Sequence, residues 1–428
     1  MTQKREIFGW AMYDFANSGF TTVVLTAVFN SYFIAVIAGD MPSGTATLIW
    51  TIIIAVANII VLFASPIAGS ITDTLGNKKT LLFISMSLCT LFTAALFFAH
   101  QGDIVYASLF VILSSVMFFI GESIVAAFLP EISNSENIGK ISGFGWALGY
   151  VGGLLVLGLC LYYINMAQAR GEEASEFVPF TMLIVAGCFF IASLPTFIFL
   201  KEQRITKRSE PLQFYIKSSF NQVKSTWHKR HTYSDMFRFM ASLLVFYSGI
   251  NTVVVIAAIY AQEVMDFQTS DTIQLILVVN VAAAIGAFIF GFVQDKLGIK
   301  NTLNITLFIW ILAMLIAYFT SSLLWFWVVA LLIGIALGSS QSAGRALVGS
   351  FSPRHHNGEF FGFWGLTVRL SAVVGPISYG LVAHFTNGDH KMSLLSTTFF
   401  FIAGFLLLRM VNEERGKKTA QSNSVSPL

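Results

Sequence analysis

The chain has 428 residues, of which 56% are hydrophobic, 14% aromatic and only 11% charged, and its formal net charge is +3. An ordinary soluble domain carries about 25% charged residues. The composition therefore excludes a soluble fold and indicates a membrane protein.

Apolar stretches of about 20 residues are long enough to cross a bilayer as helices. Twelve such stretches follow one another, near residues 7–37, 46–71, 80–99, 104–129, 142–164, 179–200, 238–262, 271–293, 302–320, 323–350, 360–385 and 393–411. The first is too long for a cleaved signal peptide and is expected to remain as a helix. The predicted fold class is an all-α polytopic membrane protein with twelve transmembrane helices.

Lys and Arg are unevenly distributed between the two sides of this predicted bundle. If the N-terminus is cytoplasmic, Arg170 and Lys391 fall outside, Arg345 and Arg369 lie within helices, and the other 21 of the 25 fall inside. This asymmetry follows the positive-inside rule and predicts an inner (plasma) membrane protein with both termini in the cytoplasm. The basic run over 201–230 is then predicted to be a cytoplasmic loop. Because cytoplasmic loops of membrane proteins are usually basic, this run is not evidence for nucleic-acid binding.

Three sequence markers recur in the same order, about 220–230 residues apart. The pattern G-x3-D-x2-G-x-K follows the second and the eighth predicted helix, Ser18–Val24 resembles Ser248–Val254, and Phe128–Pro130 resembles Phe351–Pro353. Ordered repeats indicate two related six-helix bundles. Duplicated membrane bundles place a binding site between the copies.

The repeats also divide the chain. We expect an N-terminal bundle over 1–200, a basic cytoplasmic linker over 201–237, a C-terminal bundle over 238–411 and a disordered cytoplasmic tail over 412–428. Apolar residues from Leu212 to Trp227 recur at helical spacing, so the linker is predicted to contain a short amphipathic helix. That helix lies on the inner membrane surface or packs against the bundle ends.

Two six-helix halves, a basic central loop and the repeated G-x3-D-x2-G-x-K pattern resemble the major facilitator superfamily. Four stretches are similar to its vacuole-effluxer branch: Trp10–Ser18, Phe128–Glu131, Ser142–Gly153 and Gly358–Phe363. The resemblance implies a secondary transporter that works by alternating access, with the first, fourth, seventh and tenth helices around the path. Because fungal members of the branch are amino-acid effluxers, it also implies a small polar substrate, with an amino acid preferred.

Ionisable groups inside a membrane are costly to place and are candidates for function. Asp14 stands about two turns into the first helix, and Asn17, Ser18 and Thr21 follow on the same face. We expect this stripe to line a wet cavity, where Asp14 could exchange a proton, and Asn251 is a further candidate for the pathway. The alternative is a carboxylate held by a neighbouring helix or by its own helix N-terminus.

Glu122 and Arg345 occupy matching positions in the two halves, each eight residues before the proline of the repeated marker. The resemblance places them on opposite sides of the path, so we expect them to face each other. Three uses stay open: an ion pair that gates one side, a receptor for a zwitterionic substrate, or a structural pair. Arg369 is a second deep cation, for an anionic substrate or a carboxylate elsewhere.

The repeated loop pattern is expected to control gating rather than to bind substrate. Each aspartate can accept hydrogen bonds from a helix start in the other half or pair with a cation, and each second glycine permits a tight turn. The gating residues are Gly69, Asp73, Gly76, Lys78, Gly291, Asp295, Gly298 and Lys300.

Other kinds of site have little support in the sequence. Cys89, Cys160 and Cys188 lack the spacing of a disulfide framework or a metal site, and His355–His356 has no further ligands at metal spacing. No set of catalytic residues is recognisable, so we expect no enzyme activity, no metal, no cofactor and a monomer in the lipid bilayer. Rival hypotheses are an exporter of amphipathic compounds such as drugs or siderophores, favoured by the 42 Phe and 13 Met, and a non-transporting membrane sensor.

Overall fold

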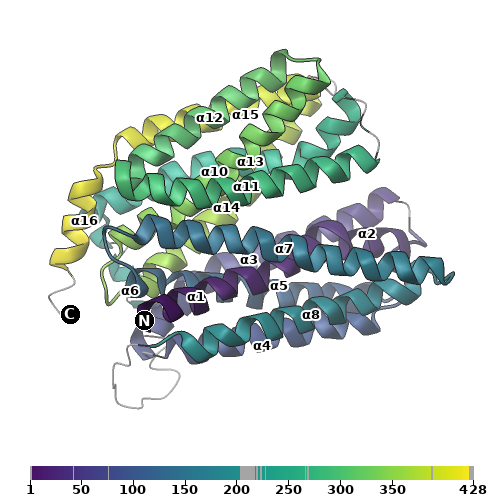
Figure 1. Cartoon of the computed structure of the whole chain (residues 1–428), viewed down its shortest axis with the longest axis horizontal. Coiled ribbons are helices and arrows are strands. Elements are labelled where there is room, and N and C mark those ends of the chain that lie inside the picture. The colour runs from purple at the N-terminus through teal and green to yellow at the C-terminus, as the bar shows by residue number, and fades with distance from the viewer. Residues whose placement is uncertain are drawn as a thin grey trace.

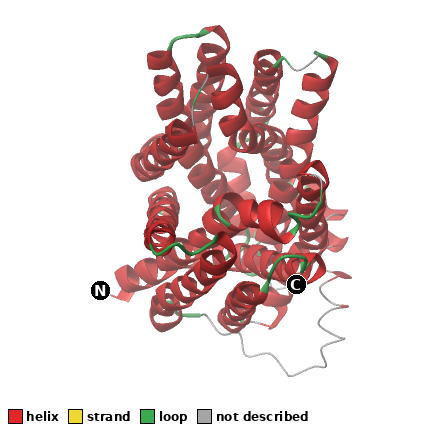
Figure 2. Ribbon diagram, turned by 90° about the vertical axis from the view of Figure 1, so that its right-hand side faces the viewer, coloured by secondary structure: helices red, strands yellow, loops and turns green. Residues whose placement is uncertain are grey.

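The structure is a computed structural model, and it describes residues 2–423 apart from 42, 76, 203–216, 218–219, 222–223, 227, 266, 268 and 387–388. All regular secondary structure in this part of the chain is helical (Figure 2). The helices are α1 (Thr2–Gly19), η1 (Phe20–Ala27), α2 (Phe29–Tyr32), η2 (Phe33–Ile37), α3 (Ser43–Leu75), α4 (Lys78–Ala95), η3 (Leu96–Phe98), α5 (Ile104–Ala126), α6 (Leu129–Ile132), α7 (Ile138–Ala169), α8 (Ala174–Phe199), η4 (Lys229–His231), α10 (Ser234–Met265), α11 (Thr269–Leu297), α12 (Ile299–Phe319), α13 (Leu323–Phe351), α14 (Asn357–Phe385), α15 (His390–Arg409) and α16 (Glu413–Ser422).

Twelve spans among the described residues are long and apolar enough to cross a membrane. The first combines α1, η1, α2 and η2, and the fourth combines α5 and α6. The predicted all-α fold with twelve transmembrane helices is therefore confirmed. Long apolar side chains such as Phe63 and Phe319 are 67% and 79% exposed on the bundle surface, as expected where lipid replaces water.

The helices form two groups, one from α1 to α8 and one from α10 to α15 (Figure 1). Helix α7 lies beside α11, and α3 lies beside α14, so these four helices carry much of the boundary between the halves. The start of α1 and helix α16 lie at the same end of the bundle (Figure 1). We call this end the linker side, because the segment that joins the halves also leaves from it.

Small residues let the helices of the two halves approach closely, as is typical of membrane bundles. A Cβ atom on Gly69 of α3 would lie 1.9 Å from the carbonyl oxygen of Gly358 on α14. One turn further along, a Cβ atom on Gly362 would lie 2.6 Å from Cα of Pro66. Larger side chains at these glycines would force the two helices apart.

The end of the chain differs from the sequence prediction. The tail was expected to be disordered over 412–428, but Glu413–Ser422 forms helix α16, with the Asn412 side chain accepting a hydrogen bond from the N–H of Arg415 as its N-cap. Tertiary contacts explain the helix, because Arg415 binds Asp235 of α10 through two hydrogen bonds of 2.6 and 2.8 Å. The predicted amphipathic helix over 212–227 lies largely outside the described residues, as does Gly76.

Candidate functional site

At the linker side, Asp73 at the end of α3 joins the two halves. Its carboxylate accepts hydrogen bonds from the backbone N–H groups of Gly358, at 2.9 Å, and Glu359, at 2.8 Å. These groups belong to the first turn of α14, where unpaired N–H groups and the helix dipole favour a negative charge. Lys78 lies 3.2 Å from Asp73 and 2.7 Å from Glu131, so the carboxylate is also neutralised from its own half.

Asp295 of α11 repeats this contact with the halves exchanged. Its carboxylate accepts hydrogen bonds from the N–H groups of Gly139, at 3.0 Å, and Lys140, at 3.1 Å, in the first turn of α7. Close packing accompanies the contact, since a Cβ atom on Gly143 would lie 2.4 Å from the carbonyl oxygen of Ala287. Two carboxylates thus cap two helix starts across the boundary, one in each direction.

Besides the two aspartates, the repeated loop pattern has a tight turn at Gly298 and lysine residues that do not make equivalent contacts in the two halves. Gly298 adopts φ +88° directly before α12, which is the conformation that the predicted tight turn requires. Lys300 was expected to match Lys78, but its Nζ donates to the carbonyl of Val411 at 2.5 Å. It matches Lys79 instead, whose Nζ donates to the carbonyl of Leu200 at 2.8 Å, because both are the second residue of their helices.

An ion pair between Asp14 of α1 and Arg345 of α13 lies deeper in the protein. Nη1 of Arg345 is 2.7 Å from the Asp14 carboxylate, and both side chains are nearly inaccessible. The guanidinium group lies over the rings of Trp10, at 4.6 Å, and Trp146, at 5.3 Å. Arg345 stands six residues before the end of α13, which is about 9 Å along the helix from the linker side.

Helix α7 fixes the orientation of Arg345. The arginine donates to the Ser142 hydroxyl at 3.2 Å and to the Ser142 carbonyl at 3.0 Å. The Ser142 hydroxyl in turn donates to the carbonyl of Ser342 on α13 at 2.8 Å. A Cβ atom on Gly145 would lie 2.5 Å from the Asp14 carboxylate and 2.7 Å from Nη2 of Arg345, so the ion pair occupies space that only glycine leaves free.

A second ion pair joins Glu122 of α5 to Arg369 of α14. The nearest atoms are 3.4 Å apart, and the side chains are 24% and 14% exposed, more than those of Asp14 and Arg345. The guanidinium group of Arg369 lies 3.8 Å above the ring of Phe119. Arg369 is twelve residues into α14, about 18 Å from the linker side, so this pair lies near the middle of the membrane span.

The pairing differs from the one expected from the repeat. Glu122 and Arg345 do not pair with each other; Arg345 binds Asp14, and Arg369 binds Glu122. The reason is the position of α7, whose Ser142 and Trp146 hold the arginine against α1. Glu122 nevertheless lies within electrostatic range of Asp14 and Arg345, so the four groups form one cluster.

The polar residues that follow Asp14 on α1 and η1 form hydrogen bonds mainly within this first span. The Ser18 hydroxyl donates to the carbonyl of Asp14 at 2.7 Å, and the Thr21 hydroxyl donates to the carbonyl of Ser18 at 3.0 Å. Asn17 is buried. The Asn251 amide of α10 donates to the Ser371 hydroxyl of α14 at 3.0 Å, so it joins two helices of the C-terminal half.

Aromatic residues beside the cluster bring unused polar groups. The Tyr247 hydroxyl of α10 and Nε1 of Trp146 are buried without a hydrogen-bond partner in the described part of the chain. Tyr247 lies within electrostatic range of Glu122, Arg345 and Arg369. On the same face of α7, the Tyr150 hydroxyl donates to the side-chain oxygen of Gln341 on α13. A buried polar group without a partner is costly, and a ligand can satisfy it.

Sequence reasoning missed Trp10, Ser142, Trp146, Tyr150 and Tyr247 as neighbours of the charges. Four of them lie in Trp10–Ser18 and Ser142–Gly153, two of the stretches that resemble the vacuole-effluxer branch. The signal was therefore present, but only the fold shows that α1 and α7 bring both stretches to Arg345.

Comparison with known proteins agrees with this architecture. Residues 43–421 match the family model described as vacuole effluxer Atg22 like. The uncharacterized MFS-type transporter YxiO of Bacillus subtilis is 26% identical over 424 residues, which cover 98% of this chain and 97% of that protein. Autophagy-related protein 22 of Yarrowia lipolytica is 24% identical over 358 residues, which cover 72% of this chain and 56% of the fungal protein.

Solved structures share the fold at low sequence identity. The proton:xylose symporter XylE, bound to 6-bromo-6-deoxy-D-glucose, superposes with a TM-score of 0.77 at 14% identity, over 99% of both chains. The transporter FucP in its outward conformation gives 0.73 at 13% identity, over 96% of this chain and all of FucP. The family match over most of the chain, together with the twelve-helix fold, shows that this protein is a transporter of the major facilitator superfamily and belongs to its vacuole effluxer Atg22-like family.

Proposed function

We propose that this protein moves a small polar solute, with an amino acid as the preferred substrate, across the inner membrane by alternating access. The observation that carries the proposal is the separation of charges between the halves. Both carboxylates, Asp14 and Glu122, belong to the N-terminal half, and both guanidinium groups, Arg345 and Arg369, belong to the C-terminal half.

This separation constrains how the linker side can open. When the halves move apart, each ion pair is broken, leaving two carboxylates in one half and two guanidinium groups in the other. An uncompensated buried charge costs several kcal/mol. A zwitterion supplies both missing charges, because its carboxylate fits an arginine fork and its ammonium group fits a carboxylate.

The two pairs are suited to different tasks. Asp14 and Arg345 are close together, buried and held by α7, which favours a gate. Glu122 and Arg369 are further apart and more exposed, which favours substrate binding. The Tyr247 hydroxyl and Trp146 Nε1, which are buried without a hydrogen-bond partner among the described residues, are assigned to substrate contacts. A protonated Asp14 or Glu122 would supply the coupling to a proton gradient.

The state of the transporter follows from the contacts at the linker side. Asp73 and Asp295 hold the two halves together there, and the positive-inside rule assigns this side to the cytoplasm. We therefore infer a conformation closed to the cytoplasm, which agrees with the likeness to FucP in its outward conformation. The description of the family as vacuole effluxers supports a solute transporter.

Thermal unfolding of the purified protein tests substrate class. A ligand that binds only the folded state raises the melting temperature by mass action. We expect stabilisation by one or more amino acids that is lost in Glu122→Gln and in Arg369→Gln and kept in Lys391→Gln, whose lysine lies on the opposite side. Stabilisation by amphipathic drugs or siderophores alone would favour the exporter hypothesis instead.

Uptake into proteoliposomes tests coupling. The stabilising amino acid is expected to accumulate in response to an imposed pH gradient, and this response should be lost when Asp14→Asn and Glu122→Gln are combined. Flux that ignores the gradient and survives both substitutions would contradict proton coupling.

A further inference from the structure

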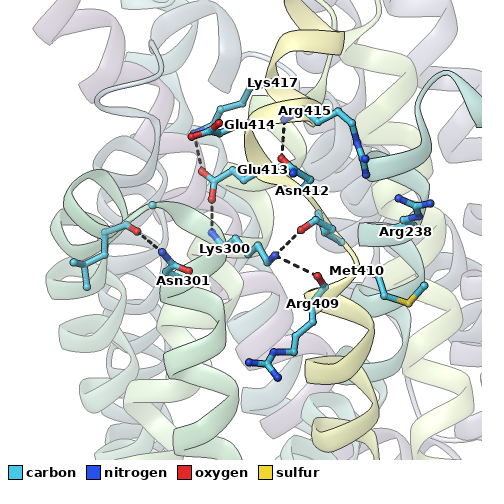
Figure 3. A pocket seen from close by; sticks show the side chains of 13 residues that line it. Arg238, Lys300, Asn301, Arg409, Met410, Asn412, Glu413, Glu414, Arg415 and Lys417 are labelled. Carbon is cyan, nitrogen blue, oxygen red and sulfur yellow. Dashed lines mark hydrogen bonds and ion pairs between the residues drawn. The ribbon is translucent and has the colours of Figure 1, made fainter.

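A charged pocket opens on the linker side of the C-terminal half (Figure 3), and its lining does not include the residues of the two deep ion pairs. It has a volume of about 770 Å³ and lies where α10 and α12 begin and α11 and α15 end, beside α16. Its lining residues are Arg238, Leu297, Gly298, Lys300, Asn301, Arg409, Met410, Val411, Asn412, Glu413, Glu414, Arg415 and Lys417.

Among the described residues, two cations of the pocket, Arg409 and Lys300, have no carboxylate in ion-pair contact, and a third, Arg238, shares its carboxylate with another arginine. Arg409 lies over the ring of Phe405 at 5.5 Å, with no carboxylate in ion-pair contact. Nζ of Lys300 donates to the backbone carbonyls of Arg409 and Val411. Arg238 approaches Asp235 at 3.8 Å, but that carboxylate already accepts two shorter hydrogen bonds from Arg415. The three cations come from three different helices.

The two glutamates of the pocket do not neutralise Arg238, Lys300 and Arg409. Glu413 accepts hydrogen bonds from the N–H groups of Ile299, at 3.3 Å, and Lys300, at 2.9 Å, and also binds Lys417 at 2.6 Å. Glu414 lies at the α16 end of the pocket, away from Arg409 (Figure 3). The region between Arg238, Lys300 and Arg409 is therefore suited to an anion.

Apolar side chains next to these cations place the pocket at the membrane surface. Leu297 is 54% exposed and Met410 is 59% exposed, and both line the pocket. Arg238 lies near the start of one membrane span, and Arg409 is the last residue of another. Charged side chains at the ends of spans lie at the level of the lipid headgroups.

We propose that this pocket binds the headgroup of an anionic phospholipid, with Arg238 and Arg409 attracting its negative charge from different sides of the pocket (Figure 3) and Leu297 and Met410 beside the acyl chains. Basic pockets at the ends of transmembrane helices bind acidic headgroups through the electrostatic attraction of each nearby cation. The ligand reaches the pocket from the bilayer. The bound lipid also bridges α10 and α15 to the base of α16.

Titration of the detergent-solubilised full-length protein tests the assignment. The probes are phosphatidylglycerol, phosphatidylcholine with the same acyl chains, and inorganic phosphate, each followed by the melting temperature. We expect phosphatidylglycerol to stabilise the protein and the other two to have no comparable effect. Arg238→Gln and Arg409→Gln should each weaken the lipid affinity about fivefold, and together roughly 25-fold.

Lys391→Gln is the matched control, because it removes one cation from the opposite side of the membrane and should leave the affinity unchanged. The melting temperature of each variant without lipid verifies that it folds. Equal stabilisation by the two lipids, or full affinity in the double variant, would overturn the proposal. Stabilisation by inorganic phosphate to the same extent would identify a site for soluble anions and reject the lipid.

Discussion

The guanidinium group of Arg345 lies 2.7 Å from the carboxylate of Asp14, although the two residues are 331 positions apart and belong to different halves of the protein. The contact joins the first span to the tenth, and Ser142 of the fifth span holds it in place. Any motion that opens the linker side must break it.

Removing one partner of the pair should be worse than removing both. Arg345→Gln leaves a buried carboxylate without compensation, and Asp14→Asn does the same to the arginine, so we expect each to cost about 3–5 kcal/mol. The double variant should recover part of this loss because neither charge remains. Unfolding of the four proteins in detergent gives the coupling free energy as a double-mutant cycle, and additive losses would show that the pair contributes nothing.

Gly145 is predicted to be required for the same pair. In Gly145→Ala the new methyl group would lie 2.5 Å from the Asp14 carboxylate, which forces α1 and α13 away from α7. We expect a loss of about 1–3 kcal/mol, as for overpacking, together with reduced transport. Gly158→Ala on the same helix is the control, since nothing lies within 4 Å of a Cβ atom there. Equal behaviour of the two variants would contradict the close packing at Gly145.

The capping carboxylates Asp73 and Asp295 are predicted to set the balance between closed and open states. An asparagine keeps one acceptor but loses the charge, so Asp73→Asn and Asp295→Asn should each weaken closure by about 1–2 kcal/mol. That corresponds to a roughly 5- to 30-fold rise in the ratio of open to closed molecules. Distances between spin labels at Ser135 and Lys418, both exposed on the linker side, measure this ratio. Asp40→Asn, at an exposed site on the opposite side, should leave it unchanged.

The sequence contained the charged residues of the site but not their pairing. Asp14, Glu122, Arg345 and Arg369 are recognisable because charge inside an apolar span is costly. The repeat also placed Glu122 and Arg345 at equivalent depth. Depth does not determine the rotation of a helix or the helix that supports it, however, and here Ser142 and Trp146 of α7 turn Arg345 toward Asp14.

Helix α16 shows a second limit of local sequence signals. Its residues are polar, so no apolar stripe predicts a helix, and its order depends on partners far away in the chain. Arg415 binds Asp235, and Gly416 packs so closely on Phe351 that a Cβ atom would lie 2.5 Å from the ring. The local indications of a helix start were the N-cap Asn412 and the acidic residues Glu413 and Glu414 of the first turn.

Glutamates that follow the last helix of each half form equivalent contacts. Glu202 accepts a hydrogen bond at 3.1 Å from the N–H of Lys79, at the start of α4. Glu413 accepts hydrogen bonds from the first two residues of α12. Each glutamate thus caps the third helix of its own half, and Lys79 or Lys300 returns a hydrogen bond to the carbonyl at the end of the sixth. These contacts fasten outer helices together, so each half can move as a unit.

Glu413→Gln is therefore predicted to loosen α16 and the end of α15. The substitution removes a charged cap at the N-terminus of α12 and the ion pair with Lys417, so docking should weaken by about 1–2 kcal/mol. Trypsin cleavage at Arg415 and Lys417 reports the undocked population when opening is fast, and it should accelerate roughly 5- to 30-fold. Glu414→Gln is the matched control, because the neighbouring carboxylate is exposed and caps no helix in the described structure. If both variants were cleaved at the rate of the unmodified protein, the Glu413 cap would not hold α16 in place.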